Sequence, residues 1–216
     1  MVTEFTKIFS FFKQPGIFVS LKKTNTMGQA KEKKDIYTYE EYLVLEQQDQ
    51  IRYEFFHGEV FAMAGGTKDH NRIANNMHHY VDNLLSDSCD IFTGDVKIEI
   101  NHLLHYIYPD VVLTCDPKDL KDGKDHKILY PALIIEVLSK STRGYDQDEK
   151  KAAYMRLPSL LYYVLVDQYK CYIEVYERLK DSWNYKIYDH LDDTIGFTQL
   201  DLKVPISEIY RRVKFT

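Results

Sequence analysis

The sequence predicts an α/β protein of the α+β type, in which helices pack on a mixed β-sheet. Segments with helical spacing of apolar residues alternate with strand-like runs, in the order helix, hairpin, helix, three strands, helix, strands. Tyrosine, which suits half-buried strands, occurs 18 times in 216 residues. A hydrophobic share of 44% and a charged share of 28% are typical of a globular protein.

Three helices are expected. Thr38 and Glu41 form a capping box that opens a short helix ending near Gln48. A longer helix is expected over about residues 69–86, because apolar side chains recur there at helical spacing. The third covers about residues 145–157 and is ended by the proline that follows it.

The strands follow from apolar runs and from alternation. Residues 52–56 and 59–63 flank His57-Gly58 and predict a hairpin. Near the end of the next expected strand, apolar and polar residues alternate, which is typical of a half-exposed strand. The strands expected after the hairpin span residues 91–101, 107–115, 132–138, 161–166, 171–177 and 183–188.

A length of 216 residues fits one domain with a sizeable core. We expect a single domain over residues 35–216, preceded by a poorly ordered extension over residues 1–34 in which Met27 is the natural start. The apolar runs of this extension are too short and too often interrupted for a membrane span, and no signal-peptide cleavage site follows them.

The cysteines and the net charge narrow the class of protein. Cys89, Cys115 and Cys171 are far apart and odd in number, which argues against a disulfide framework or a thiolate zinc site and favours a cytoplasmic protein. The net charge of −5 counts against a protein that coats nucleic acid. It allows an enzyme that touches phosphate at one local site.

Glu136 is the residue that most needs an explanation, since it lies inside the apolar run Ala132–Leu138. Burying an unpaired carboxylate costs several kcal/mol, so a buried Glu usually has a partner. A salt bridge to a core Lys or Arg, or an exposed strand end, would explain it without any function. A role in a reaction is the alternative.

Asp110 and Lys150 favour a functional site. Asp110 follows Pro109 on another predicted central strand, although a Pro-Asp pair alone more often starts a turn. Two carboxylates on neighbouring buried strands are ligands that suit Mg²⁺. Asp146, Lys150 and Tyr154 share one helix face at i, i+4 and i+8. Lys150 could then project over the carboxylates, or pair with Asp146 in solvent.

These residues belong to an ordered set of motifs. In chain order the set is Arg52–Glu59, His70, Pro109-Asp110, Glu136–Ser139, Ser141-Thr142, Asp146, Lys150, Tyr154 and Tyr162–Asp167. The set resembles the putative restriction endonuclease family within the PD-(D/E)XK nuclease superfamily. The resemblance runs from about Tyr37 to Asp167 and continues more loosely to Tyr188.

The resemblance implies a restriction-endonuclease-like core of α-β-β-β-α-β order, with an N-terminal helix and β-hairpin before it and a C-terminal β-hairpin after it. It also implies that Asp110 and Glu136 hold a metal ion, Mg²⁺ or Mn²⁺, with the backbone carbonyl of Val137 as a further ligand. Such an ion would polarise the phosphate and lower the pKa of bound water.

The lysine of the motif departs from the superfamily's pattern. Leu138 stands two residues after Glu136, where a lysine is usual. In similar family members the lysine has moved to the following helix, and Lys150 occupies that position here, with Lys151 and Lys140 as substitutes. Lys150 would orient the attacking water or stabilise charge on the phosphate.

Two further residues are candidates of second rank. Glu54 could complete the acidic cluster through the hairpin. His70 could contact phosphate or an acidic residue, although a histidine in a first helical turn is more often a cap or a surface residue. The resemblance thus implies a metal-dependent endonuclease with DNA as its substrate, and it allows a homodimer.

Two other functions stay open. The acidic net charge and Leu138 are compatible with a catalytically weak or inactive module that binds nucleic acid or protein on the same scaffold. A metal-dependent hydrolase of another phosphoester is the third hypothesis. Metal titration separates the binding module from an enzyme. A panel of substrates separates the hydrolase of another phosphoester from a nuclease.

Overall fold

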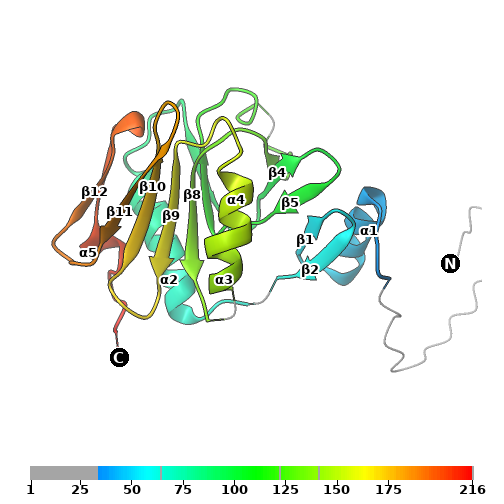
Figure 1. The fold of residues 1–216 in the computed structure, drawn as a ribbon, viewed down its shortest axis with the longest axis horizontal. Helices are drawn as coiled ribbons and strands as arrows, with labels where there is room; N and C mark the ends of the chain where they lie inside the picture. The colour runs from blue at the N-terminus through cyan, green and yellow to red at the C-terminus, as the bar shows by residue number, and fades with distance from the viewer. Residues whose placement is uncertain (1–33, 64, 122, 141, 216) are drawn as a thin grey trace, which may run out of the picture. The chain divides into compact units, whose positions relative to one another are not determined.

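The computed structural model describes residues 34–63, 65–121, 123–140 and 142–215 (Figure 1). The predicted extension over residues 1–34 and the start at Met27 therefore fall outside the described residues, apart from Lys34. The division into residues 1–34 and 35–216 stays a prediction.

A six-stranded sheet forms the centre of the fold, in the order β11-β10-β9-β8-β6-β3. Its strands are β3 (Asp90–Thr93), β6 (Val111–Thr114), β8 (Pro131–Leu138), β9 (Tyr162–Asp167), β10 (Ile173–Arg178) and β11 (Trp183–Tyr188). Strands β8 and β9 are parallel, and the other neighbours in this sheet are antiparallel. Every residue of β8 and β9 is buried, which explains why both appear in the sequence as nearly continuous apolar runs.

Helices cover the two faces of this sheet. Helix α2 (Lys68–Asp82) packs on the face that carries Leu133, Ile135 and Val137 of β8. The opposite face carries Ile134 and Leu138, which pack with residues of α4 (Lys151–Tyr154). Glu136 alternates with these last two residues, so it faces the α4 side.

A second sheet of five strands lies beside the central sheet, towards the right of Figure 1. In the order β2-β1-β5-β4-β7 its strands are β2 (Glu59–Ala62), β1 (Tyr53–Phe56), β5 (His105–Ile107), β4 (Lys97–Asn101) and β7 (Lys127–Ile128). Helix α1 (Tyr39–Asp49) begins with the predicted capping box of Thr38 and Glu41, which is confirmed. Tyr42 of α1 is buried against Phe55 and Tyr106 of this sheet.

Two expected strands are each divided in the structure. Residues 91–101 form β3 and β4, separated near Gly94, whose positive φ of 53° turns the chain. Residues 107–115 form β5, which begins at residue 105, and β6, separated by Pro109-Asp110, where proline has no N–H to donate to a strand ladder. In both cases the chain crosses from one sheet to the other. Asp110 therefore lies at the junction between the two sheets.

The helix expected over residues 145–157 is present, but it contains a wider turn. It consists of α3 (Arg143–Tyr145), the π-helical segment η1 (Asp146–Lys150) and α4. The hydroxyl of Tyr163 on β9 donates a hydrogen bond to the backbone oxygen of Asp146 at 2.9 Å. Such π turns are rare and occur frequently at functional sites. Asp146 and Lys150 mark its two ends, and both are buried.

Four C-terminal elements were not expected from the sequence. They are β12 (Thr194–Phe197), η2 (Thr198–Leu200), β13 (Leu202–Pro205) and α5 (Ile206–Ile209). Ile195, Phe197 and Val204 bury their side chains in the core on the α2 side of the central sheet. These short elements thus complete the core rather than form a separate unit.

The predicted fold class is confirmed. Helix α2, strands β3, β6 and β8, the helical segment α3–η1–α4 and strand β9 follow one another as α-β-β-β-α-β, with β4 and β5 inserted between β3 and β6 and β7 inserted between β6 and β8. The N-terminal helix with its hairpin β1–β2 and the later hairpin β10–β11 are also as expected. Among the described residues, no helix has the length and apolar character needed to cross a membrane.

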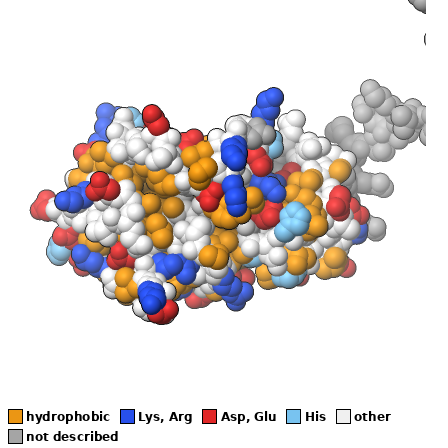
Figure 2. Space-filling view, turned by 90° about the horizontal axis from the view of Figure 1, so that it is seen from above, with side chains coloured by type: hydrophobic (Ala, Val, Ile, Leu, Met, Phe, Trp, Pro, Cys, Tyr) orange, Lys and Arg blue, Asp and Glu red, His pale blue; other side chains and the backbone are white. Residues whose placement is uncertain are grey.

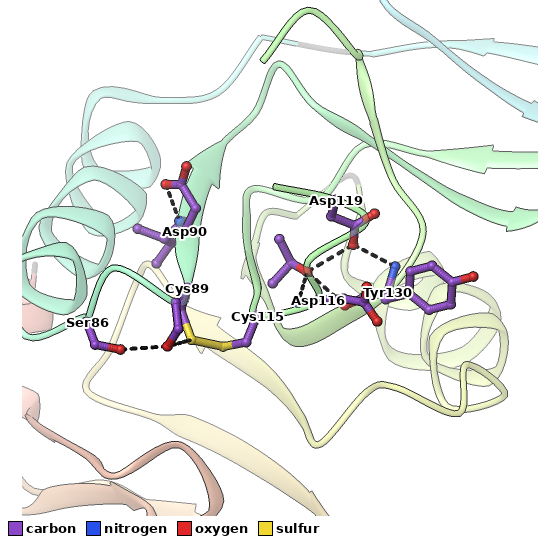
Figure 3. Close-up of a disulfide and its surroundings, with 10 residues drawn as sticks. Ser86, Cys89, Asp90, Cys115, Asp116, Asp119 and Tyr130 are labelled. Carbon is purple, nitrogen blue, oxygen red and sulfur yellow. Dashed lines mark hydrogen bonds between the residues drawn. A yellow bond between two sulfur atoms is a disulfide. The ribbon is translucent and has the colours of Figure 1, made fainter. Parts of the chain in front are cut away.

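The cysteine pattern argues against a disulfide framework, but the structure contains one disulfide. Cys89 and Cys115 are joined by a disulfide, with their Cα atoms 4.1 Å apart (Figure 3). Cys89 precedes β3 and Cys115 follows β6, and the antiparallel pairing of Asp90 with Thr114 brings them together. Because the two cysteines are 26 residues apart in the chain, the sequence alone does not show that they pair. Cys171 is a free cysteine.

Loss of this disulfide should destabilise the fold. We expect Cys89→Ser to lower the free energy of unfolding by about 2–4 kcal/mol, because the link restrains the unfolded chain. Urea denaturation with and without reductant measures this, and Cys171→Ser serves as the control that keeps the disulfide. Equal unfolding of the wild-type protein under both conditions would contradict the prediction.

Candidate functional site

Asp110 and Glu136 meet because β6 and β8 are neighbours. Val111 pairs with Ile135, so Asp110, one residue earlier, lies beside Glu136, one residue later. The backbone N–H of Asp110 donates to Glu136 Oε2 at 3.4 Å, and the N–H of Val137 donates to Asp110 Oδ2 at 2.7 Å. The two predicted metal-binding carboxylates are therefore adjacent, as the strand argument required.

Lys150 lies among buried carboxylates on the same face of the sheet. Its Nζ is 2.9 Å from Glu54 Oε1, 3.3 Å from Glu136 Oε1 and 3.5 Å from Asp146 Oδ1. All four side chains are less than 10% exposed. The hydroxyl of Tyr154 donates to Glu136 Oε1 at 3.0 Å. Lys150 does pair with Asp146, but in the interior and not in solvent.

Three separate parts of the chain bring these groups together. Glu54 comes from β1 of the five-stranded sheet, Glu136 from β8 of the central sheet, and Lys150 from the π turn η1. We call the carboxylates the acidic cluster, which consists of Glu54, Asp110, Glu136 and Asp146. Asp146 belongs to the motifs that carry the family resemblance, but it is not among the predicted site residues. Its i, i+4 spacing with Lys150 is the sequence feature that could have identified it.

His70 extends the site on the α2 side. Its Nε2 is 3.2 Å from Asp110 Oδ2, and Thr67, not His70, caps the helix by accepting from the His70 backbone N–H at 3.1 Å. A β-carbon added to Gly66 would lie 2.8 Å from Nδ1 of the His70 ring, so glycine leaves room for this ring position. The structure thus places His70 beside an acidic residue, which was one of its two expected roles.

Burial and charge shift the pKa values in opposite ways within the site. Burial raises the pKa of Glu136 well above its usual value of 4.5, and the neighbouring charges of Asp110 and Asp146 add to this while Lys150 opposes it. Burial lowers the pKa of Lys150, but Glu136, Glu54 and Asp146 outweigh it and raise that pKa. The Lys150 ammonium therefore stays protonated.

The pKa of His70 is also raised. Burial lowers it, but the hydrogen bond and charge of Asp110, the charge of Asp146 and a backbone contact with Val137 outweigh burial. His70 thus adds positive charge beside Asp110 below its raised pKa. The acidic cluster nonetheless holds more carboxylates than these two cations can neutralise.

A cleft of about 1100 Å³ opens onto these groups. Its lining includes the acidic cluster with Lys150 and His70, and also Phe56 and Phe61 of the hairpin β1–β2. A second cavity of about 760 Å³ shares Tyr108, Asp110 and His70 with it. Sequence reasoning missed the two phenylalanines, although strand alternation with Glu54 could have placed them on its side of the hairpin.

The substitute lysines lie apart from the cluster. Lys140 lines the cleft with its Nζ 5.4 Å from the Tyr169 ring centre, and Lys151 lies 5.0 Å from that of Tyr176. Of the three candidates, the structure places Lys150 against Glu136. In the described part of the chain, no group of three or more His, Cys, Asp or Glu side chains has an arrangement that could hold a metal ion.

A family model, two relatives and one solved structure are similar to this chain. The model of the family Uma2, described as "Putative restriction endonuclease", matches residues 39–204. Two uncharacterized proteins of Synechocystis sp. are similar: slr1290 is 35% identical over 82% of this chain and 92% of its own, and sll1609 is 33% identical over 68% and 83%. A solved structure from Anabaena variabilis, titled a putative nuclease belonging to DUF820, has the same fold, with a TM-score of 0.64, 14% identity, and coverage of 80% of this chain and 97% of its own.

Removing the Lys150 ammonium should destabilise the protein strongly. We expect Lys150→Met to cost about 3–5 kcal/mol of unfolding free energy in EDTA, because buried carboxylates lose their cation. Chemical denaturation measures this. Lys151→Met, one residue away, is the matched control and should cost less than about 1 kcal/mol. Equal losses for the two variants would show that the Lys150 contacts contribute little.

Replacing Glu136 should have the opposite effect. Because its pKa is raised in the folded protein, this carboxyl disfavours folding increasingly as pH rises from about 4.5 through the raised value. In EDTA we expect Glu136→Gln to gain about 1–3 kcal/mol over the wild-type protein at pH 8, and much less at pH 4.5. Denaturation at a series of pH values measures the difference. A constant or shrinking difference would contradict the prediction.

Proposed function

Since this chain belongs to the Uma2 family, described as "Putative restriction endonuclease", we propose that it is a metal-dependent endonuclease that hydrolyses phosphodiester bonds in DNA. The observation that carries the proposal is the meeting of Asp110, Glu136 and Lys150 in the lining of the cleft. Glu136 lies on β8, Lys150 lies in the π turn η1, and Asp110 comes directly before β6.

The donor set suits Mg²⁺ or Mn²⁺. We propose Asp110, Glu136 and the backbone carbonyl of Val137 as ligands, since Mg²⁺ is commonly bound by one or two carboxylates with water and phosphate completing its shell. The acidic cluster also has more carboxyl groups than cationic partners, which favours a cation. When bound, the metal would supply Lewis acidity and a water of lowered pKa.

The protein's own side chains would then orient the attacking water and stabilise the charge on the phosphate. Lys150 stays protonated, so it would donate hydrogen bonds to the attacking water or to a phosphate oxygen rather than accept a proton. Glu54 holds the ammonium at 2.9 Å and is a positioning residue in this proposal. Tyr154 fixes one oxygen of Glu136. His70, which contacts Asp110 Oδ2, would orient that carboxylate or contact phosphate.

One observation favours the alternative of a catalytically weak or inactive binding module. The Lys150 ammonium already contacts three carboxylates, which could hold it away from a substrate. Titration of the protein with Mg²⁺ and Mn²⁺ by calorimetry separates the two proposals, because the module needs no metal. The homodimer and the cytoplasmic location stay predictions from the sequence.

Cleavage should require both carboxylates and the metal. We expect purified protein to nick supercoiled plasmid in Mg²⁺ or Mn²⁺, and Asp110→Ala or Glu136→Ala to slow this at least about 100-fold. Gel assays measure the rate, and Asp181→Ala, which removes an exposed carboxylate, is the control. Cleavage that persists in both site variants, or in EDTA, would exclude the proposed site.

A further inference from the structure

We propose that the cleft binds an unpaired nucleobase, stacked on Phe56 and Phe61, next to the phosphate that is cleaved. The inference rests on the proposed function and narrows its substrate to nucleic acid that is single-stranded or locally unpaired. It follows from the arrangement of side chains on one face of the sheet β2–β1–β5 and from the charges of the side chains that line the cleft.

The face that carries Glu54 also carries the two phenylalanines. Phe56 lies two residues after Glu54 on β1, and Phe61 pairs directly with Glu54 across the hairpin. Side chains that alternate or pair in this way lie on the same face of a sheet. His105 of β5 pairs with Phe56 and extends this face, and all four residues line the cleft.

Both rings are exposed although the other face of this small sheet is buried. Phe61 is 47% and Phe56 41% exposed, whereas Phe55 and Val60 are each less than 10% exposed. Seen from above, hydrophobic side chains surround a histidine at the end of the molecule that carries β1 and β2 (Figure 2). The Phe56 ring makes edge contacts with the rings of His57 and His105, so Phe61 offers the more accessible aromatic surface beside the acidic cluster.

The other side chains of the cleft offer little attraction for a duplex. Ala152 and Arg156 line the cleft from α4 and its end, together with Glu149 from η1. Arg156 and Lys140 can contact a phosphate, but Glu149 repels one, and so does Glu59, which pairs with Phe56 on the hairpin. Duplex DNA carries a charge per ~1.7 Å of axis, and its binding normally relies on many cationic contacts. A cleft with few cations and exposed aromatic rings fits a less charged strand.

Stacking on the aromatic rings would provide the attraction for nucleic acid that the charges of the cleft do not. Aromatic side chains stack on bases of single strands regardless of sequence, since every base has a π face. In a duplex these faces are covered by neighbouring bases. A base beside the cleaved phosphate that stacks on Phe61 would hold that phosphate near Asp110 and Glu136, because Phe61 pairs with Glu54 of the acidic cluster.

Binding of labelled oligonucleotides tests the inference. Fluorescence anisotropy in Ca²⁺ compares a single-stranded DNA with the same sequence as a duplex and as single-stranded RNA. We expect the wild-type protein to bind a single strand at least tenfold more tightly than the duplex. Phe61→Ala should weaken single-strand binding by about 5- to 100-fold and leave duplex binding unchanged.

Two further substitutions separate stacking from apolar contact. Phe61→Trp keeps an aromatic face and should retain binding, whereas Phe61→Leu keeps apolar surface and should bind like Phe61→Ala. Tyr185→Ala removes a ring of similar exposure, 48%, on β11 of the other sheet, and should change nothing. Circular dichroism of each variant verifies its fold. A Phe61→Leu variant that binds like the wild-type protein would overturn the stacking role.

The outcomes also separate this inference from the proposed function. If plasmid cleavage depends on Asp110 while single-strand binding does not depend on Phe61, the inference fails and the nuclease stands. If no cleavage occurs but Phe61-dependent single-strand binding does, the stacking of a base in the cleft stands, and the nuclease and the cleaved phosphate beside that base do not. Phe61-dependent binding of RNA alone supports stacking and identifies the polymer as RNA. Tighter binding of the duplex, or no binding of any strand, overturns the inference.

Discussion

The contact that joins the parts of this protein is the buried ammonium of Lys150 among carboxylates. Glu54 reaches it from the five-stranded sheet, Glu136 from the central sheet, and Asp146 from the same π turn. A buried charge is stable only with close partners, so these contacts restrict where the hairpin β1–β2 can lie relative to the helix. The position of the cleft walls depends on the same restriction.

The crossing of the chain between the two sheets has a chemical consequence. Strand β5 of one sheet ends at Ile107, and Pro109 and Asp110 lead into β6 of the other, which begins at Val111. Side chains at such a junction are less covered than those in the middle of a strand, and the Asp110 carboxylate is 20% exposed whereas that of Glu136 is 3% exposed. Both carboxylates line the cleft, and Asp110 is the more accessible of the two.

Stability and the proposed function conflict at Glu136. A carboxyl with a raised pKa weakens the fold when it is charged, and an aliphatic or amide side chain would pack there without that cost. The observed compensation comes from Lys150 and from the hydroxyl of Tyr154. Groups held against their own solvation preference in a cleft are frequent at functional sites, and the proposed metal would relieve the same charge.

Local signals in the sequence were enough for much of the fold. The capping box of Thr38, the helical spacing in α2 and the apolar runs of β8 and β9 are short-range patterns, and the structure confirms each. The two divided strands were not recognised, because β-branched and aromatic residues continue on both sides of Gly94 and Pro109 and each part belongs to a different sheet. Sheet membership is a long-range property that alternation does not carry.

The candidate site also depends partly on short-range patterns and partly on long-range pairing. By itself the sequence determined that Glu136 interrupts an apolar strand, that Asp110 comes directly before another, and that Asp146 and Lys150 have i, i+4 spacing. Only the tertiary structure decided that Glu54 reaches Lys150, that Cys89 meets Cys115, and that the hairpin turns its phenylalanines into the cleft. The reason is physical: spacing along a chain dictates which side chains share a face, whereas pairing between distant strands dictates which faces meet.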